Sequence, residues 1–325
     1  RKILLQLSEQ FDQGLLLNQI DLGNYNSLDA ALLYFQAVHE YYYYTKDKQT
    51  VRKLLPVMET TLNSLAKGSK YGIKLNKSGF LIWESPKEAL TWMDAKTAQG
   101  PVTPRQGAPI EIQALWYNAL QVTEKLAAEV SFKLRTGTQI DTFEHMLEMN
   151  FSKQFWLEDK NYFTDVIDQF GNKDIKLRPN QLIAFSLAFP IGSKQHWEKL
   201  ENKIETELYS PVGLKTLSSD HPEYKGEYSG DQTERDMAYH QGTIWPWLLQ
   251  PYFIGLIRFN KGGRRIVREK LDLFYEKIRL HGLDSVPELF SADRNEPRGA
   301  IAQAWSVAAL LESVMYLNDT RPEIE

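Results

Sequence analysis

The chain has 325 residues, of which 42% are hydrophobic and 25% charged, and its net charge is -4. These values are typical of a globular chain of one large or two small domains, and they exclude the basic surface that binds nucleic acid. No run of about eighteen apolar residues occurs, so neither a membrane-spanning helix nor a membrane partner is expected. The absence of Cys excludes disulfides, thiolate zinc sites and a Cys nucleophile, and it fits a cytoplasmic protein.

Helices of two kinds are predicted to alternate along the chain. Nearly uncharged helices are typical of segments buried on most faces, whereas helices with one charged face meet water on that side. The nearly uncharged segments are residues 28–44, 179–187, 238–257 and 300–317. The amphipathic or charged segments that accompany them are residues 1–13, 46–67, 138–154, 193–208 and 260–280.

This alternation predicts a single all-α domain in which a ring of inner helices is wrapped by outer helices. Loops at one end of such a ring would line a central pit. The loop segments whose polar and aromatic residues suit that pit are residues 24–29, 92–111, 231–247 and 285–293. About eleven helices are expected, an odd number for paired packing, which predicts a truncated N-terminus.

Local signals set the ends and faces of several of these helices. Ser27 is predicted to cap the helix over residues 28–44, and Pro56 to kink or split the helix over residues 46–67. On the helix that Glu111 opens, apolar residues recur at three-to-four spacing and predict one buried stripe. The residues of that stripe are Ile112, Leu115, Ala119, Val122, Leu126 and Val130.

Short β-hairpins are predicted to interrupt the helices. One covers residues 71–83, around a turn at residues 76–79, and another lies within residues 155–177. Residues 209–239 and residues 285–299 are expected to be irregular. Connections as long as the first of these are usually functional or disordered.

The stretch over residues 91–120 carries a first group of candidate site residues. Its Gly and Pro residues forbid one long regular element, and they indicate a loop followed by a helix. Carboxylates accept hydrogen bonds from hydroxyl groups, and Trp offers a flat apolar face with a polar edge. The stretch therefore suits a neutral, polyhydroxylated ligand, and the alternative is a surface loop with a buried Trp. The candidates are Trp92, Asp94, Arg105, Glu111 and Trp116.

Several catalytic machineries have no match in the sequence. The phosphate-binding and dinucleotide-binding glycine motifs, the nucleophile elbow and the H-E-x-x-H zinc motif are all missing. The 6 His residues do not pair at ligand spacing, so no metal site built on His is expected. No Asp-Asp pair occurs, which argues against a helical cyclase that binds magnesium through clustered aspartates. Carboxylates remain as the candidate catalytic groups.

Glycoside hydrolysis needs only two carboxyl groups, one protonated acid and one carboxylate that acts as base or nucleophile. Asp94 has Trp, Met and Ala as its neighbours, an apolar surround that would raise its pKa and keep a proton available. Glu288 follows a Pro in a predicted loop and is the candidate base, with Asp293 as its competitor. The structural alternative for Glu288 is an acid at the start of a helix.

A third group of candidates lies within residues 235–247, where two Trp flank a Pro after a His-Gln-Gly turn. Trp and Tyr can stack on sugar faces, while the polar side chains of this segment can bind hydroxyl groups. The structural alternative is a core Trp pair at a helix start, with Pro246 in its first turn. The candidates are Asp236, Tyr239, His240, Gln241, Trp245 and Trp247.

Separated blocks of the chain together resemble the C-terminal domain of glycogen debranching enzymes, the amylo-α-1,6-glucosidase family. They stand in the family's order and span nearly the whole chain. Their most specific motifs are T-W-M-D, which ends at Asp94, H-Q-G-T-I-W-P-W, and P-E-L-F, which contains Glu288. The blocks are residues 14–29, 90–120, 213–217, 239–251 and 285–305.

The resemblance implies that residues 1–325 form one (α/α)6 toroid, without the N-terminal β-sandwich or transferase region that relatives carry. It implies that Asp94 is the general acid and Glu288 the general base. It further implies substrate contacts from Asp29 and from the Tyr, His, Gln and Trp candidates within residues 239–247.

The sequence thus predicts an inverting exo-α-glucosidase that removes α-1,6-linked glucose from glycogen, a limit dextrin or another α-glucan, without a metal or organic cofactor. In inverting enzymes the two carboxyl groups are about 6.5 to 9.5 Å apart, against about 5 Å in retaining enzymes. Departures from the family pattern at Gln113 and residues 291–292 bear on substrate preference. The alternatives are a toroid glycosidase acting on trehalose, malto- or isomalto-oligosaccharides, a non-catalytic glucan-binding domain, and a helical scaffold.

Overall fold

The computed structural model of the chain describes residues 1–279 and 285–319. Within these residues helices dominate, and the strands are only two or three residues long. The chain divides into two compact units. The first unit contains Arg1–Trp156, Val166–Asp174 and Leu187–Ile191, and the second contains Leu157–Asp165, Ile175–Ser186 and Gly192–Glu325.

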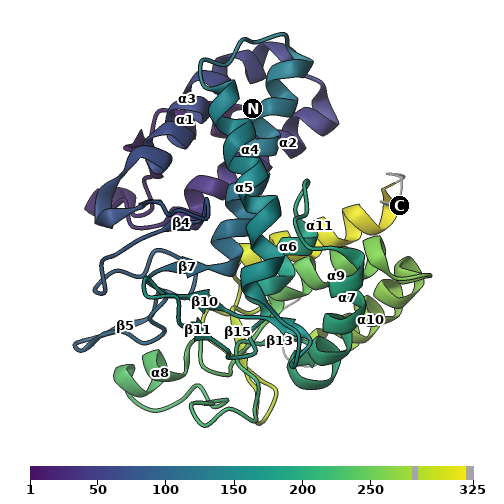
Figure 1. The fold of residues 1–325 in the computed structure, drawn as a ribbon. Coiled ribbons are helices and arrows are strands. Elements are labelled where there is room, and N and C mark those ends of the chain that lie inside the picture. The colour runs from purple at the N-terminus through teal and green to yellow at the C-terminus, as the bar shows by residue number, and fades with distance from the viewer. Residues whose placement is uncertain (280–284, 320–325) are drawn as a thin grey trace. The chain divides into compact units, whose positions relative to one another are not determined.

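The first unit is built around one long buried helix. Its helices are α1 (Lys2–Ser8), α2 (Leu28–Thr45), α3 (Lys48–Lys67), α4 (Ile110–Glu129) and α5 (Gly137–Phe155). α4 packs against α2, α3 and α5 (Figure 1). The predicted apolar stripe of this helix is confirmed, because every residue in it is buried. A helix that meets neighbours on several sides needs such a wide apolar surface.

The start of α2 is confirmed at the predicted residue. The Ser27 side chain accepts a hydrogen bond from the N–H of Ala30 and so satisfies one of the free donors at the helix N-terminus. The N–H of Leu28 donates to the carbonyl oxygen of Leu90 at 2.8 Å. This second bond ties the start of α2 to the loop that carries Asp94.

α3 continues through Pro56 as a single helix, so the predicted split is wrong for this part of the described chain. Pro56 lies on the exposed side of α3. There, water can bond the carbonyl oxygen of Arg52, which would otherwise accept from the N–H that Pro lacks. The helix therefore tolerates Pro at this position.

The first helix is shorter than predicted. α1 ends at Ser8, and a hairpin of β1 (Phe11–Asp12) and β2 (Leu15–Leu16) follows it. The hairpin turn is made by Gln13 and Gly14, which both have positive φ, 51° and 86°. Two such residues in a row match the right-handed twist of a tight hairpin, and this local turn prevails over the helical pattern.

The remaining strands of the first unit form short hairpins in its loops. The predicted hairpin over residues 71–83 is confirmed by two paired strands. A second hairpin directly follows Asp94. A third pair of strands also bonds the strand that leads into α4. The strands are β3 (Lys74–Leu75), β4 (Leu81–Ile82), β5 (Lys96–Thr97), β6 (Gly100–Pro101), β7 (Ala108–Pro109), β10 (Val166–Ile167) and β11 (Lys173–Asp174).

The second unit is built around an apolar helix. Its α-helices are α6 (Ile183–Ser186), α7 (Lys194–Lys203), α8 (Gln232–Ala238), α9 (Leu249–Phe259), α10 (Gly263–Arg279) and α11 (Ala304–Asn318). α9 is buried over most of its length and packs against α6, α7, α10 and α11. The uncharged segment at residues 179–187 is not one helix as predicted, because a 3₁₀ turn over Pro179–Leu182 precedes the single turn of α6.

A five-stranded antiparallel sheet has four of its strands in the two segments that were expected to be irregular. Its order is β12-β13-β14-β15-β16, and Val212, Ile244 and Phe290 form a buried apolar cluster on it. That expectation is therefore wrong for these strands, which are too short to show a period-two pattern. The fifth strand lies within residues 238–257, where the predicted helix is therefore wrong up to the start of α9 at Leu249. The strands are β12 (Tyr209–Ser210), β13 (Gly213–Lys215), β14 (Ile244–Trp245), β15 (Leu289–Ser291) and β16 (Glu296–Arg298), with β8 (Trp156–Leu157) and β9 (Tyr162–Phe163) forming a separate hairpin.

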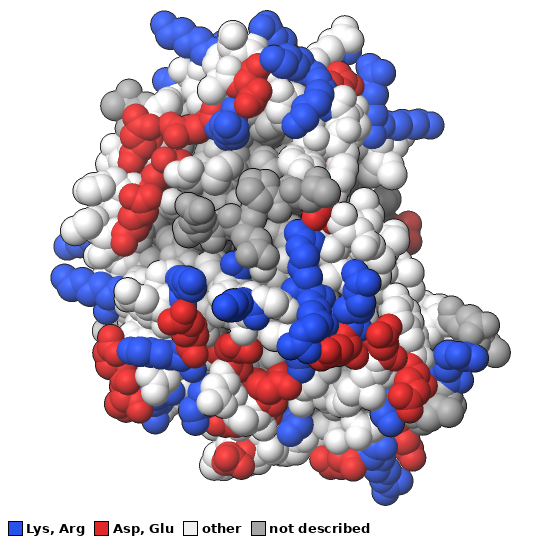
Figure 2. Space-filling view, turned by 90° about the vertical axis from the view of Figure 1, so that its right-hand side faces the viewer, with Lys and Arg blue, Asp and Glu red and all other residues white. Residues whose placement is uncertain are grey.

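Charges of both signs are interspersed over the face shown in Figure 2, as expected from the small net charge. Among residues 1–279 and 285–319, no helix has both the length and the apolar character needed to cross a membrane.

Candidate active site

The loop that carries Asp94 is held by backbone and side-chain bonds on both sides. Thr103 Oγ1 donates to the carbonyl oxygen of Met93 at 3.0 Å, and the N–H of Val102 donates to that of Ala95 at 2.9 Å. Met93 is fully buried, and Trp92 keeps 8% of its surface exposed. The residues on either side of Asp94 are therefore fixed in the protein interior.

Asp94 itself stays accessible to solvent between these buried neighbours. The protein atoms around it still remove enough water to raise its pKa to about 6, and the negative charge of Asp29 adds to this effect. Within the described residues, no side chain donates a hydrogen bond to Asp94. The raised pKa keeps a fraction of this carboxyl group protonated near neutral pH, as a general acid requires.

Asp29 lies in the first turn of α2 and is mostly buried. Its carboxylate accepts hydrogen bonds from the Ser27 hydroxyl and from the N–H of Ala30, at 2.8 Å for the latter. Burial raises the pKa of Asp29, and these hydrogen bonds, with one from the backbone of Trp92, oppose that rise. Asp29 thus contacts the Asp94 loop through the backbone and influences Asp94 through its charge.

Arg105 and Glu111 form an ion pair in the interior of the first unit, with 3% and 1% of their side-chain surfaces exposed. A guanidinium nitrogen of Arg105 also lies 3.8 Å from the sulfur of Met93. The ligand contacts expected of Arg105 and Glu111 remain predictions, and in the structure burial leaves these two side chains almost no surface. Their ion pair supports the Asp94 loop through the contact between Arg105 and Met93.

The binding role expected of Trp116 also remains a prediction. It lies on α4 with none of its surface exposed and packs near Phe143, with ring centroids 6.3 Å apart. The sequence alternative of a buried Trp therefore holds at this position. A Trp within a helix that is buried on most sides has no route to a ligand.

In the second unit, the carboxylate of Glu288 is held by three donors. The Tyr239 hydroxyl donates to Oε1, Gln303 Nε2 donates to the same oxygen at 3.2 Å, and the N–H of Ala300 donates to Oε2 at 2.8 Å. The Glu288 backbone N–H also bonds the carbonyl oxygen of Ala300 at 2.9 Å. A carboxylate offers about four lone-pair sites, so one stays available on Oε2 for a water molecule.

Gly299 fits closely beneath this carboxylate. Its φ is +69°, which side-chain-bearing residues rarely adopt. A Cβ at this position would collide with Oε2 of Glu288. Glu288 therefore depends on a Gly at position 299 to reach the N–H of the next residue, Ala300. Glu288 precedes β15 and is half-buried, so the alternative of an acid at a helix start is wrong.

Tyr239 stands at the edge of an aromatic group. Its ring lies 5.7 Å from that of Tyr228 and 4.9 Å from that of Trp245. Trp245 Nε1 donates to the carbonyl oxygen of Tyr239 at 3.0 Å, and His240 stacks on Trp245 at 5.4 Å. The binding roles expected of His240 and Trp245 remain predictions, and in the structure 0% and 2% of their surfaces are exposed. Both rings pack against the ring of Tyr239.

Gln241 is held by Arg178, a residue that the sequence analysis did not select. The guanidinium of Arg178 donates to Gln241 Oε1 at 2.6 Å and to the carbonyl oxygen of His240 at 2.7 Å. Both side chains are mostly buried. Asp236, on α8, is half-buried and accepts from Gln232 Nε2 at 2.7 Å. Asp236 and Gln241 keep some exposed surface and remain candidates.

Trp247 stacks on Trp305, with ring centroids 4.2 Å apart and planes 18° from parallel. Trp247 keeps 6% of its surface exposed, and Trp305, at the start of α11, keeps 39%. Trp305, Gln303 and Tyr228 were not predicted as site residues, although the first two belong to the block that ends in I-A-Q-A-W. Gln303 and Trp305 are a polar and an aromatic residue close to P-E-L-F in the sequence, and this could have identified them as site residues.

Asp293 lies apart from this arrangement. It is exposed, and the Tyr224 hydroxyl donates to its Oδ1 at 3.3 Å. It lines an open cavity of about 470 Å³ together with the segment around Tyr224 and the residues of α8. A single hydrogen bond leaves Asp293 less constrained than Glu288.

Solved structures of other proteins share the fold of this chain. A GH63 mannosylglycerate hydrolase from Thermus thermophilus in complex with Tris matches with a TM-score of 0.67 and 12% identity, over 96% of this chain and 87% of that chain. A GH78 family rhamnosidase of Bacillus sp. GL1 matches with a TM-score of 0.62 and 15% identity, over 95% of this chain and 28% of that one. The predicted (α/α)6 toroid with short hairpins in its loops, a glycoside hydrolase fold, is confirmed.

The chain belongs to the amylo-alpha-1,6-glucosidase family, whose model matches residues 1–312. The sequence resemblance is thereby confirmed at the level of the family. The glycogen debranching enzyme of Saccharomyces cerevisiae is 27% identical over 337 aligned positions, which cover 75% of this chain. The alignment spans only 22% of that yeast protein.

Proposed function

We propose that the chain hydrolyses α-1,6-linked glucose at the branch points of glycogen or a limit dextrin, as an inverting exo-glucosidase. Membership of the amylo-alpha-1,6-glucosidase family supports a glycosidase. The observation that carries the catalytic proposal is the contrast between two carboxyl groups. One has a pKa raised to about 6, and the other is held by three hydrogen-bond donors.

Asp94 is the proposed general acid. Its carboxyl group donates a proton to the glycosidic oxygen as the bond to the leaving sugar breaks. The raised pKa supports this role, since a general acid works best when its pKa lies near the working pH. Its access to solvent, between buried neighbours, leaves room for a sugar to approach.

Glu288 is the proposed general base. It takes a proton from a water molecule that attacks the anomeric carbon from the opposite face, so the product is released as β-glucose. The donors Tyr239, Gln303 and the N–H of Ala300 fix the orientation of this carboxylate. No metal or organic cofactor takes part in these steps.

Five further residues are proposed to contact the glucan. Asp29 and Asp236 would accept hydrogen bonds from sugar hydroxyls, and Trp92 and Trp247 would present ring surface to a sugar face. Gln241 would bind hydroxyl groups with the part of its amide that Arg178 leaves accessible. A cytosolic location is part of this proposal, and the composition without Cys is compatible with it.

Substrate profiling tests the proposal. Glucose release is measured from a phosphorylase limit dextrin, isomaltose, maltotriose and trehalose at equal concentrations of non-reducing ends. The proposal predicts that the limit dextrin is the best substrate by kcat/KM. Preferred hydrolysis of trehalose or of maltotriose would assign the chain to another toroid glucosidase. Glucan binding without any glucose release would indicate a non-catalytic binding domain.

A further inference from the structure

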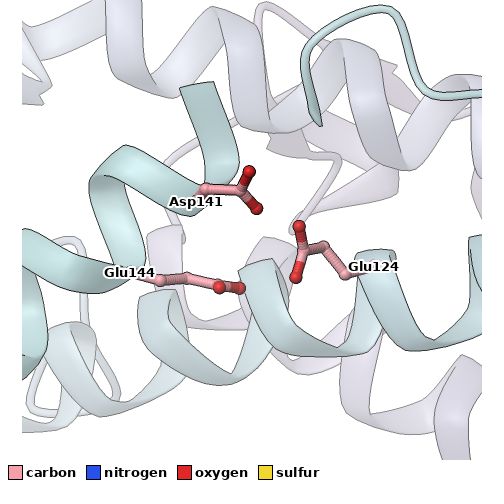
Figure 3. Close-up of side chains that lie close together, drawn as sticks. All are labelled: Glu124, Asp141 and Glu144. Carbon is pink, nitrogen blue, oxygen red and sulfur yellow. The ribbon is translucent and has the colours of Figure 1, made fainter. Parts of the chain in front are cut away.

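Three carboxylates meet between two helices of the first unit, away from the residues proposed for catalysis. Glu124 lies on α4, and Asp141 and Glu144 lie three residues apart on α5. One carboxylate oxygen from each lies within 4.8 Å of the other two. Figure 3 shows the three side chains pointing toward one another from the two helices. Like charges this close repel one another unless something between them compensates.

Glu144 provides a second, separate observation. Only 8% of its surface is exposed, and its buried Oε1 has no hydrogen-bond partner among the described residues. A buried carboxylate oxygen that accepts no hydrogen bond is costly, because it has lost water and gained nothing in return. The side chain points toward Glu124 and Asp141 rather than to solvent.

The surrounding side chains do not supply the missing positive charge. On α4, Lys125 pairs with Glu129 at 3.5 Å. On α5, the next acid along the helix is Glu148, which accepts from the Tyr117 hydroxyl at 2.9 Å. Within residues 1–279 and 285–319, no Lys, Arg or His forms an ion pair with any of the three carboxylates.

We propose that Glu124, Asp141 and Glu144 bind one hard divalent cation, with Ca²⁺ preferred. All three donors are carboxylate oxygens, which Ca²⁺ binds and softer metals do not favour. Ca²⁺ takes six to eight oxygen ligands in flexible geometry. Three carboxylates, some of them bidentate, supply part of this shell, and water supplies the rest on the side of Asp141, which is exposed.

The cation is structural rather than catalytic. Glu124 lies 13 residues after Glu111 on α4, which is about 20 Å along a helix axis. Glu111 belongs to the end of α4 next to the Asp94 loop. A cation at the far end of α4 joins this helix to α5 and stabilises the first unit, and it leaves the chemistry at Asp94 untouched.

Thermal unfolding tests this site. Protein dialysed against EDTA is unfolded in CaCl₂, MgCl₂ or NaCl at matched ionic strength. At a Ca²⁺ concentration about 100-fold above Kd, the wild-type Tm should rise by about 4 °C. Glu144→Gln should lose this response, and in EDTA it should be more stable than wild type, because the amide removes one repelling charge.

Glu148→Gln is the matched control, since it removes an acid from the same helix and leaves the three carboxylates intact. It should keep the Ca²⁺ response. Asp141→Asn, at an exposed position, provides a second test should Glu144→Gln fail to fold, and it too should lose the response. A response to Mg²⁺ that equals the Ca²⁺ response would assign the site to Mg²⁺ as well.

Isothermal titration of the EDTA-treated wild type should give one Ca²⁺ per chain. The proposal is overturned when the wild-type Tm is the same in EDTA, CaCl₂ and MgCl₂. It is also overturned when Glu148→Gln loses the response together with Glu144→Gln, because the effect would then be general charge screening. In either case the three carboxylates share protons rather than a cation.

Discussion

Asp94 in the first unit and Glu288 in the second are both carboxylic acids, but the surroundings of their carboxyl groups differ. Partial loss of hydration and the charge of Asp29 raise the pKa of Asp94 to about 6. Glu288 instead receives hydrogen bonds from Tyr239, Gln303 and the backbone of Ala300. Loss of water favours the protonated form of Asp94, whereas the three donors fix the orientation of the Glu288 carboxylate. Two similar side chains thereby become suited to the roles of acid and base.

The means of support differ as well. The Asp94 loop is fixed through its neighbours, since Met93 and Ala95 accept backbone or side-chain bonds while the carboxyl group itself has no side-chain donor among the described residues. Glu288 is fixed through its own carboxylate, next to a strand of the five-stranded sheet. Substitutions near Asp94 should therefore change its pKa, and substitutions near Glu288 should change its position.

The largest expected effect comes from removing either carboxyl group. Asp94→Asn and Glu288→Gln should each lower kcat on a limit dextrin by about 10²- to 10⁴-fold, the usual contribution of a general acid or base. Thermal unfolding of each variant, compared with wild type, controls for loss of the fold. Activity above a tenth of the wild-type value in a folded variant would remove that residue from the mechanism.

The next largest effect concerns the ion pair below the Asp94 loop. Glu111→Gln leaves the Arg105 guanidinium buried without its partner charge, and this should lower the free energy of unfolding by about 3 to 5 kcal/mol. Denaturant titration measures the change. Glu269→Gln is the control, because it breaks an ion pair of similar length with Arg265 at an exposed position, where little change is expected. Unchanged stability but a raised KM in Glu111→Gln would restore a binding role.

A third prediction perturbs the position of Glu288. Gly299→Ala places a methyl group against Oε2 of Glu288, and kcat should fall about 100-fold, since small misplacements of a reacting group cost about that much. Gly262→Ala is the matched control, because its φ is +76° and open space surrounds it. Both variants should lose similar stability from backbone strain, but only Gly299→Ala should lose activity. Equal activity in the two would show that Glu288 does not need its present position.

The pH dependence of activity tests the environment of Asp94. A general acid must be protonated, so kcat/KM should fall as pH rises above about 6. Asp29→Asn removes a negative charge and should move this fall to lower pH, though not to 3.8, because burial is the larger cause of the shift. Lys96→Met removes the positive charge that opposes the shift, and it should move the fall to higher pH. Shifts in the same direction would contradict the electrostatic account.

The smallest effect is expected at Asp293. It is exposed, and among the described residues its side chain bonds the Tyr224 hydroxyl alone. Asp293→Asn should change kcat by less than about threefold, far below the effect of removing a general base. Measured beside Glu288→Gln, it decides which of the two acids is the base. A loss larger in Asp293→Asn than in Glu288→Gln would reverse the assignment.

The predictions that rest on long helical patterns in the sequence were the most reliable. The start of α2 at its Ser cap and the buried stripe of α4 were both predicted, because capping and helical periodicity are local properties. The raised pKa of Asp94 also followed from its apolar neighbours in the chain. These features depend on residues that lie close to one another in sequence.

The other features depend on contacts between distant segments. Strand β15 exists because Ile244 and residues near 297 pair with it, and two- or three-residue strands carry no period of their own. Nothing local in the sequence distinguishes the buried Trp116 or His240 from an exposed aromatic residue at a binding site. The donors of Glu288 were missed for the same reason, since Tyr239 and Gln303 lie 49 and 15 residues away from it.

The central claim is that Asp94 and Glu288 act as acid and base of an inverting glucosidase. Proton NMR of a limit dextrin digest, recorded before mutarotation, reads the anomer of the released glucose directly. The account predicts β-glucose from wild type and no glucose from Asp94→Asn or Glu288→Gln. Release of α-glucose would mean retention and a nucleophilic carboxylate. Unchanged release from either variant would mean that the reaction proceeds without that carboxyl group.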